Sequence, residues 1–277
     1  MISEYRQKVL NRRTQYEIEG RFDEDLEDDP PTIELKPQDI DYLSKSLVKR
    51  IKTFFVNKKG QKLINSLEKN KQLIIDKVCG IENFIAVKGG AMITCNHFHP
   101  FDNFAVWQVI KPYMHGNKLY KIIREGNYTN PPSPYGPFFK YANTLPLSSN
   151  PKTMQNCFRA VDYYLKKGKK ILIYPEQAMW WNYRKPRPLK NGAFNFAVRS
   201  NVPVLPIFIT MEDSDVLDGD GCPVEKLTLH FLPAIYPDLS LSKADNIEMM
   251  KNKNFEAWKQ VYESVYGEKL AYNTKGQ

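Results

Sequence analysis

The residues best suited to acid–base chemistry are His97 and Asp102, which have four residues between them in the stretch AMITCNHFHPFDNFAVW (residues 91–107). Histidine is the usual general base at neutral pH, because its proton affinity lies near that range. A carboxylate bonded to an imidazole fixes its tautomer and stabilises the cation that forms on proton uptake. The spacing lets the chain turn and bring Asp102 back to a ring nitrogen of His97. The pair therefore predicts a general base with its orienting acid, although such a spacing also arises by chance.

The chain offers no nucleophile to accompany this pair. It contains no Gly-x-Ser-x-Gly motif, and Cys95 stands in an extended run with no residue that would activate its thiol. A base without a protein nucleophile indicates that the substrate supplies its own hydroxyl. His99 lies close to His97, but the chain has only four histidines and no cysteines paired at ligand spacing, so no metal site is expected.

The elements on either side of the pair favour an α/β fold. Residues 92–95 are apolar and β-prone, and residues 103–110 suit a helix, so the pair lies where a strand leads into a helix. Apolar runs predict buried strands elsewhere, and periodic segments predict helices between them, an alternation typical of the α/β class. Strands are expected at residues 81–88, 119–123, 144–147, 171–174, 202–209 and 227–232, and helices at 153–167, 194–200 and 246–266.

The N-terminal part has a different character. Residues 3–20 have helical composition, and the acidic stretch FDEDLEDDPP (residues 22–31) predicts either a solvated linker or a loose cover segment. Residues 39–55 carry apolar side chains at helical spacing with basic side chains opposite, and residues 57–75 continue in the same style. Such a basic amphipathic helix suits an anionic membrane surface. The alternative is that its apolar residues, Leu43, Leu47 and Ile51 among them, pack on the domain.

We therefore expect an N-terminal helix and acidic linker over residues 1–36 and a single domain over residues 37–277. Within that domain, residues 37–78 would form a helical membrane-facing segment and residues 79–240 the catalytic α/β core. Residues 241–277 would form a C-terminal helix.

Composition limits the partners and the compartment. The chain of 277 residues has a net charge of +9 and a pI near 9.1, which implies an anionic partner such as nucleic acid, a membrane surface or an acidic substrate. The basic residues are spread over several segments without a recognition motif, so nucleic acid is not expected. Four scattered cysteines favour a reducing compartment. With a charged N-terminus and no long apolar window, we expect a cytoplasmic protein, peripheral on the inner face of the cell membrane.

Four blocks follow one another along the chain: Asn96 with His97-x4-Asp102, the tripeptide YPE (residues 174–176), KNGAF (residues 190–194) and VPVLP (residues 202–206). In their order and spacing over roughly residues 85–235, they resemble the glycerophospholipid acyltransferase family, which includes the lysophosphatidic acid acyltransferases. The resemblance implies a mixed α/β core of seven or a similar number of strands, with an N-terminal helical pair resting on the membrane.

The resemblance also implies acyl transfer from a thioester donor, acyl-CoA or acyl carrier protein, to a hydroxyl of a lysophospholipid such as 1-acyl-glycerol-3-phosphate. His97 would take the proton from the acceptor hydroxyl, and Asp102 would orient His97 and stabilise its charge. Glu176 matches the family's second acidic position and would help to hold the acceptor, with backbone amides nearby stabilising the oxyanion. Lys190 and Gly192 match the family's downstream pattern. No cofactor beyond the acyl donor is implied.

The chain departs from the family where the acceptor's phosphate is thought to bind. The family has Gly, Thr, Arg and Ser after the proline–glutamate pair, but this chain has QAMW (residues 177–180). The family's other arginine block falls near residues 145–149, which contain no arginine. A guanidinium group fits phosphate geometry, so Arg184, Lys185 and Arg187 are candidates to replace the missing arginines. The alternative for this basic cluster is a solvated loop.

Two alternatives stay open, a different acceptor and a protein without catalytic activity. The acceptor is a glycolipid, a lysophospholipid with a larger head group or another amphiphile, or the chain is a non-catalytic relative that binds lipid or carrier. Trp180, Trp181 and Tyr183 suit a membrane interface or the mouth of an acyl channel if they are exposed, and ordinary packing if they are buried.

Overall fold

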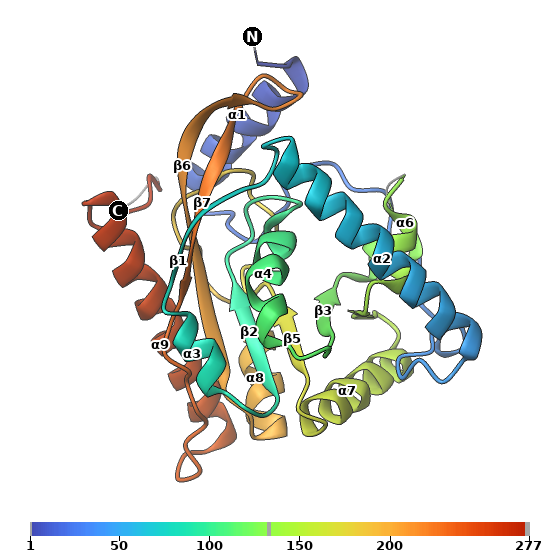
Figure 1. The fold of residues 1–277 in the computed structure, drawn as a ribbon. Coiled ribbons are helices and arrows are strands. Elements are labelled where there is room, and N and C mark those ends of the chain that lie inside the picture. The colour runs from blue at the N-terminus through green and yellow to red at the C-terminus, as the bar shows by residue number, and fades with distance from the viewer. Residues whose placement is uncertain (1, 132–133, 275–277) are drawn as a thin grey trace.

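The computed structural model describes residues 2–131 and 134–274, and its central feature is a seven-stranded sheet (Figure 1). The strand order is β1-β7-β6-β2-β5-β3-β4, and among these pairs only β6 and β7 run antiparallel. The sheet is therefore mixed, which confirms the expected α/β class. The strands are β1 (Ile74–Cys79), β2 (Ala91–Cys95), β3 (Leu119–Ile123), β4 (Thr144–Pro146), β5 (Lys170–Ile173), β6 (Val204–Leu217) and β7 (Pro223–Phe231).

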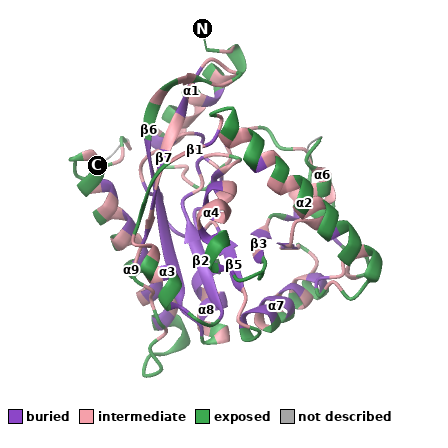
Figure 2. Ribbon diagram, in the orientation of Figure 1, coloured by how far each residue is buried: buried purple, intermediate pink, exposed green. Residues whose placement is uncertain are grey.

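Helices cover both faces of the sheet, and Figure 2 shows the central strands β2 and β5 as buried. Side chains alternate along a strand, so Met92 of β2 packs into one apolar cluster while Ile93 packs into the other. One cluster lies under α7 (Pro151–Lys166), α8 (Gly192–Ser200) and α9 (Lys243–Tyr266). The other lies under α2 (Leu47–Lys69), α3 (Ile81–Ala86) and α4 (Asp102–Ile110).

The parallel strands β2, β5 and β3 are neighbours in the centre of the sheet. Leu172 of β5 pairs with Ile93 on one side and with Lys121 on the other, so the three strands end along one edge. In α/β sheets, ligands bind beyond the carboxyl ends of parallel strands, because the connecting loops bring polar groups together there. The loop with the predicted His–Asp pair begins at this edge.

Two of the expected elements are wrong in type. Residues 81–88, expected as a strand, contain the short helix α3, and the strand β1 lies just before it, partly in the stretch expected as helix. Short apolar runs fit either structure, which is why the pattern did not separate them. Gly80 forms the turn between the two with φ of +70°, and a Cβ there would lie 2.2 Å from the carbonyl oxygen of Phe231.

The helix expected over residues 39–55 starts eight residues later. Only a 3-10 turn (Pro37–Asp39) precedes α2, which begins after Ser46, whose hydroxyl accepts a hydrogen bond from the Lys49 amide. From there α2 is continuous to Lys69. The segment 37–78 is therefore helical over only part of its length. After β3 come two short helices that the sequence did not predict, α5 (Glu125–Thr129) and α6 (Gly136–Tyr141).

The N-terminal segment covers the carboxyl edge. After α1 (Glu4–Glu19), residues 22–31 contain no helix or strand, but Leu26 is buried in a cluster with Trp180, Trp181 and Tyr183. Residues 22–31 therefore form a cover segment, which was one of the two alternatives expected for them, and not a solvated linker. The three aromatic side chains are buried as well, so they belong to ordinary packing. The described residues leave out Met1, residues 132–133 and residues 275–277. Met1 belongs to the expected N-terminal segment, and residues 275–277 belong to the expected C-terminal helix.

Candidate active site

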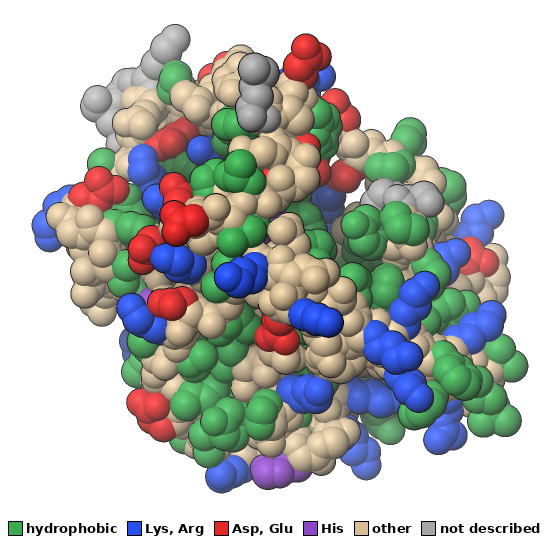
Figure 3. Space-filling view, turned by 45° about the horizontal axis from the view of Figure 1, so that its top comes forward, with side chains coloured by type: hydrophobic (Ala, Val, Ile, Leu, Met, Phe, Trp, Pro, Cys, Tyr) green, Lys and Arg blue, Asp and Glu red, His purple; other side chains and the backbone are tan. Residues whose placement is uncertain are grey.

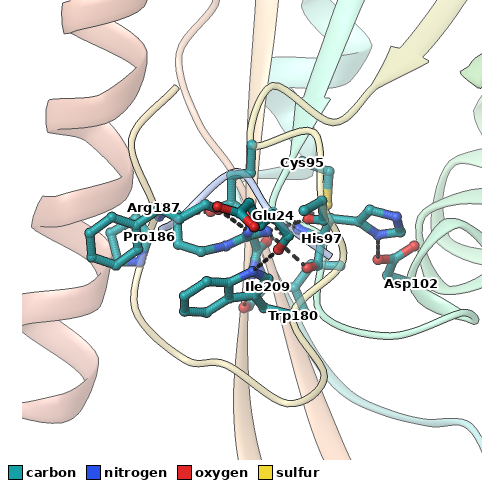
Figure 4. Close-up of polar contacts among 12 residues, drawn as sticks. Glu24, Cys95, His97, Asp102, Trp180, Pro186, Arg187 and Ile209 are labelled. Carbon is teal, nitrogen blue, oxygen red and sulfur yellow. Dashed lines mark hydrogen bonds and ion pairs between the residues drawn. The ribbon is translucent and has the colours of Figure 1, made fainter. Parts of the chain in front are cut away.

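His97 and Asp102 meet at the carboxyl end of β2. The Nδ1 atom of His97 lies 2.7 Å from Oδ2 of Asp102, as the spacing predicts (Figure 4). The Asp102 side chain is fully buried and His97 is 22% exposed, so the carboxylate is kept from water while the ring faces outward. Asp102 is also the first residue of α4, where the helix dipole favours a negative charge. With Nδ1 donating to the carboxylate, Nε2 is left to accept a proton.

Tyr174, the residue after β5, completes the environment of this pair. Its ring stacks on the imidazole with centroids 3.9 Å apart, and its hydroxyl donates a 2.5 Å hydrogen bond to Oδ1 of Asp102. Burial, with Asp102 adding to the effect, raises the pKa of the Tyr174 hydroxyl well above its usual value, so it stays protonated as a donor. Both Asp102 oxygens therefore have a partner, and the imidazole is held in one plane.

Hydrogen bonds hold the loop that carries His97 on both sides. The Asn96 side chain accepts from the Ile209 amide of β6 at 2.8 Å and donates to the Ile209 carbonyl at 3.0 Å, as a strand residue would. On the other side, the amide of Asn182 donates to the carbonyl oxygen of Phe98 at 2.9 Å. The loop that carries His97 is thus rigid before any ligand binds, which suits a positioned base.

Glu176 contributes to the same support from the interior. One of its carboxylate oxygens accepts from the His97 amide at 2.9 Å and from Nη2 of Arg187 at 3.0 Å, and the other accepts from the Arg187 amide at 2.8 Å. Arg187 further donates to the carbonyl oxygens of Ala178 and Phe22. The side chains of this ion pair are only 2% and 1% exposed. Figure 4 shows Arg187 on the side away from the His97 ring.

The other residues expected to bind substrate lie apart from the imidazole or are bonded within the protein. Arg184 pairs with Asp213, Lys185 with Glu17, and Lys190 with Asp23. Gly192 begins α8, and a Cβ there would meet nothing within 4 Å, so no close approach requires a glycine. The assignment of Glu176, Arg184, Lys185, Arg187, Lys190 and Gly192 to substrate binding stays a prediction.

Two other reactive side chains lie near the pair, and burial shifts the pKa of each. Cys95 is fully buried, and burial raises the pKa of its thiol well above its usual value, so no thiolate forms there at neutral pH. His99 accepts from the amide of Phe101 and faces a cavity of about 260 Å³; burial lowers its pKa to about 4. Within residues 2–131 and 134–274 there is no group of three or more metal-ligating side chains.

Sequence reasoning did not assign a role to Tyr174 or Arg124. Tyr174 belongs to the YPE block and directly follows a buried strand. These two features were the sequence signals that could have identified it as a site residue. Arg124 follows β3 and gave no signal of its own. Its guanidinium bonds to the carboxylates of Asp25 and Asp29, which belong to the acidic cover segment.

Comparison with known proteins gives a family match and a similar solved structure. A family model described as Acyltransferase matches residues 75–210, a range that contains His97, Asp102, Tyr174 and Glu176. Among solved structures, the chain is similar to the crystal structure of the 1-acyl-sn-glycerophosphate (LPA) acyltransferase PlsC from Thermotoga maritima. The identity is 18% over 78% of this chain and 84% of that chain, with a TM-score of 0.46. The comparison with curated proteins gives no match.

Proposed function

The chain belongs to the acyltransferase family through residues 75–210, and from this premise we propose that it moves a fatty acyl group from a thioester donor to a lysophospholipid hydroxyl. The observation that carries the proposal is the 2.7 Å contact between His97 and the buried Asp102, with Nε2 of the ring left unbonded by the residues described. This is the arrangement of a general base that acts on a proton brought by the substrate.

The reaction follows from that arrangement. Nε2 of His97 takes the proton of the acceptor hydroxyl, and the oxygen attacks the thioester carbonyl carbon. The tetrahedral intermediate collapses, the carbon–sulfur bond breaks, and the departing thiolate takes the proton back from the imidazolium. Asp102 stabilises the imidazolium, and Tyr174 holds the second carboxylate oxygen in place. The donor we propose is acyl-CoA or acyl carrier protein, since both are acidic and the chain carries a net charge of +9.

We further propose that α2 and the residues before it contact an anionic membrane from the cytoplasmic side. Tyr42 and Ile64 of this stretch are buried in the core, but a group of other apolar side chains is exposed. Figure 3 shows hydrophobic side chains mixed with Lys and Arg side chains where α2 runs. The exposed apolar residues are Leu43, Leu47, Val48, Ile51, Phe54 and Phe55. A basic apolar face of this kind binds at the lipid interface. Within the described residues, no helix has the length and apolarity needed to span a bilayer.

A second acceptor class is favoured by one observation. At the position of the missing arginine block, Ser148 and Ser149 bond to the carboxylate of Glu125, the residue that follows Arg124. These serines offer no positive charge to a phosphate. An acceptor without a phosphate monoester, such as a glycolipid or another amphiphile, is therefore the second candidate.

The test is an acyl-transfer assay with the purified chain, a labelled acyl thioester and a panel of lysolipids with and without a phosphate monoester. We expect a new acylated lipid, detected by its mass, that does not form with the His97→Ala variant. Failure of every acceptor, with the folded state intact, would contradict the proposal.

A further inference from the structure

Arg124 is a positive charge at the carboxyl edge whose only carboxylate partners, among the described residues, come from the acidic cover segment. One guanidinium nitrogen bonds to Asp25 and another to Asp29, so two carboxylates share the fork of a single arginine. A phosphate group uses the same two nitrogens with its own oxygens. The pair of carboxylates therefore occupies the contacts that a phosphate would make.

The position of Arg124 relative to His97 follows from the sheet. His97 lies in the loop after β2, Tyr174 follows β5, and Arg124 follows β3. The strands β2, β5 and β3 are parallel neighbours in the sheet. Neighbouring strands are about 4.8 Å apart, so the ends of β2 and β3 are separated by about 10 Å. Asp25 bonds to Arg124 at this edge, and burial raises the pKa of its carboxyl group although the charge of Arg124 acts to lower it.

The contacts of Arg124 are also the kind that a ligand can replace. The side chains of Arg124 and Asp29 are each 43% exposed, and Asp25 is 32% exposed. Ion pairs at such exposure contribute little to stability, because water and salt screen them. Arg187, by contrast, is buried with all its contacts inside the protein. Of these two arginines, only Arg124 can exchange its carboxylates for another anion without exposing a buried charge.

The cover segment is anchored independently of Arg124. Leu26 is buried, its carbonyl oxygen accepts from Arg12, and the carbonyl oxygen of Glu24 accepts from the indole of Trp180. Release of Asp25 and Asp29 would therefore leave the segment in place. Such a cover can give up its two carboxylate contacts without unfolding the N-terminal part.

We propose that Arg124 binds a phosphate group of the acceptor or of the donor, and that Asp25 and Asp29 occupy it until that ligand arrives. The inference rests on the proposed acyl transfer. It assigns phosphate binding to Arg124 and no longer to the basic cluster at residues 184–190. The cover makes binding selective: a neutral head group gains nothing at Arg124, while a phosphate must outcompete two carboxylates. In this respect the acidic segment sets the affinity for the anionic substrate.

The first measurement is binding of inorganic pyrophosphate to the full chain by calorimetry, which needs no activity. We expect the Asp25→Asn/Asp29→Asn variant to bind about fivefold to tenfold more tightly than wild type, and Arg124→Gln to lose binding. The single variant Asp29→Asn, at the exposed position, gives a smaller change in the same direction if the double variant does not fold. The matched controls are Asp162→Asn and Arg199→Gln, which break a similar surface pair elsewhere and should bind as wild type does. Equal affinity in wild type, the aspartate variants and Arg124→Gln would overturn the proposal.

Kinetics then identify the source of the phosphate. A lower KM of the aspartate variants for lysophosphatidic acid, with an unchanged KM for a monoacylglycerol, assigns the subsite to the acceptor. A lower KM for acyl-CoA, with an unchanged KM for lysophosphatidic acid, assigns it to the donor. The expected pyrophosphate binding without acyl transfer to any acceptor would support the subsite and contradict the proposed function, so the two failures are distinguishable.

Discussion

The Tyr174 hydroxyl and Oδ1 of Asp102 are joined by a 2.5 Å hydrogen bond, and this contact links the end of β5 to the start of α4 across the candidate active site. The same tyrosine ring stacks on His97. One residue therefore touches both members of the pair, by a ring contact and by a polar contact that can be separated experimentally.

Tyr174→Phe keeps the ring and removes the hydroxyl. The buried carboxylate of Asp102 loses one of its two hydrogen bonds, and an unsatisfied buried acceptor costs about 1–3 kcal/mol. We expect kcat to fall about tenfold with little change in KM, because the lost bond positions Asp102 and thereby the His97 base. Steady-state kinetics and a thermal melt measure both effects. An unchanged kcat would show that the bond has no role in the reaction.

Asp102→Asn and His97→Ala test the pair itself. The amide favours the wrong imidazole tautomer, and the equivalent change in serine proteases lowers kcat by about 10⁴. We expect a loss of about 10³ or more for Asp102→Asn and no measurable transfer for His97→Ala. Circular dichroism should show the fold intact in both. Substantial activity in His97→Ala would exclude this histidine as the base.

The sequence was sufficient for the His97–Asp102 pair because both residues lie in one short loop, where spacing limits the geometry. It was not sufficient for Tyr174, which reaches Asp102 from 72 residues away through the pairing of β2 with β5. The order of strands in a sheet is a tertiary property, and no local pattern contains it. Buried strands such as β5 were predictable because a continuous apolar run leaves few alternatives.

The basic cluster shows a different limit. Its charges were evident from the sequence, but their partners were not: Lys185 bonds to Glu17 and Lys190 to Asp23, both from the N-terminal segment. A charge pattern shows that cations are present and leaves open which anion neutralises them. The acidic stretch was expected as a linker or a cover segment, and its ion pairs with Lys190 and Arg124 join residues far apart in the sequence.

Glu176→Gln and Arg187→Met test the buried ion pair. Removal of one partner leaves an uncompensated charge in the interior, which destabilises proteins by about 3–5 kcal/mol. We expect each single variant to lose stability of that order in urea unfolding. The Glu176→Leu/Arg187→Met double variant should recover part of the loss, because no buried charge remains. Losses below about 1 kcal/mol in both single variants would mean that water reaches the pair.

Membrane contact through α2 is tested with vesicles of anionic and zwitterionic lipid. Phe54→Ser/Phe55→Ser removes two exposed aromatic rings, and charge reversal at Lys45, Lys49 and Lys52 removes the attraction to anionic head groups. We expect the first variant to bind both vesicle types about tenfold more weakly, and the second to lose binding to anionic vesicles alone. Leu239→Ser, an exposed apolar residue between β7 and α9, serves as the control and should bind normally. Normal binding by all variants would exclude α2 as the contact.

Lys121 of β3 gives the chain a pH-dependent stability. Burial lowers the pKa of its ammonium group from 10.5 to about 8, and within the part of the chain that the structure describes no carboxylate bonds to it. Below about pH 8 the folded chain holds this charge away from water at a cost, and the cost fades between pH 8 and 10.5 as the folded state releases the proton first. Lys121→Met should therefore raise the free energy of unfolding by about 2–3 kcal/mol at pH 7, since one pKa unit corresponds to about 1.4 kcal/mol. Urea unfolding at pH 7 and pH 10 should show the gain shrinking at the higher pH. A gain that is the same at both values would mean that the methionine stabilises by packing and that the pKa of Lys121 is the same in the folded and unfolded chain.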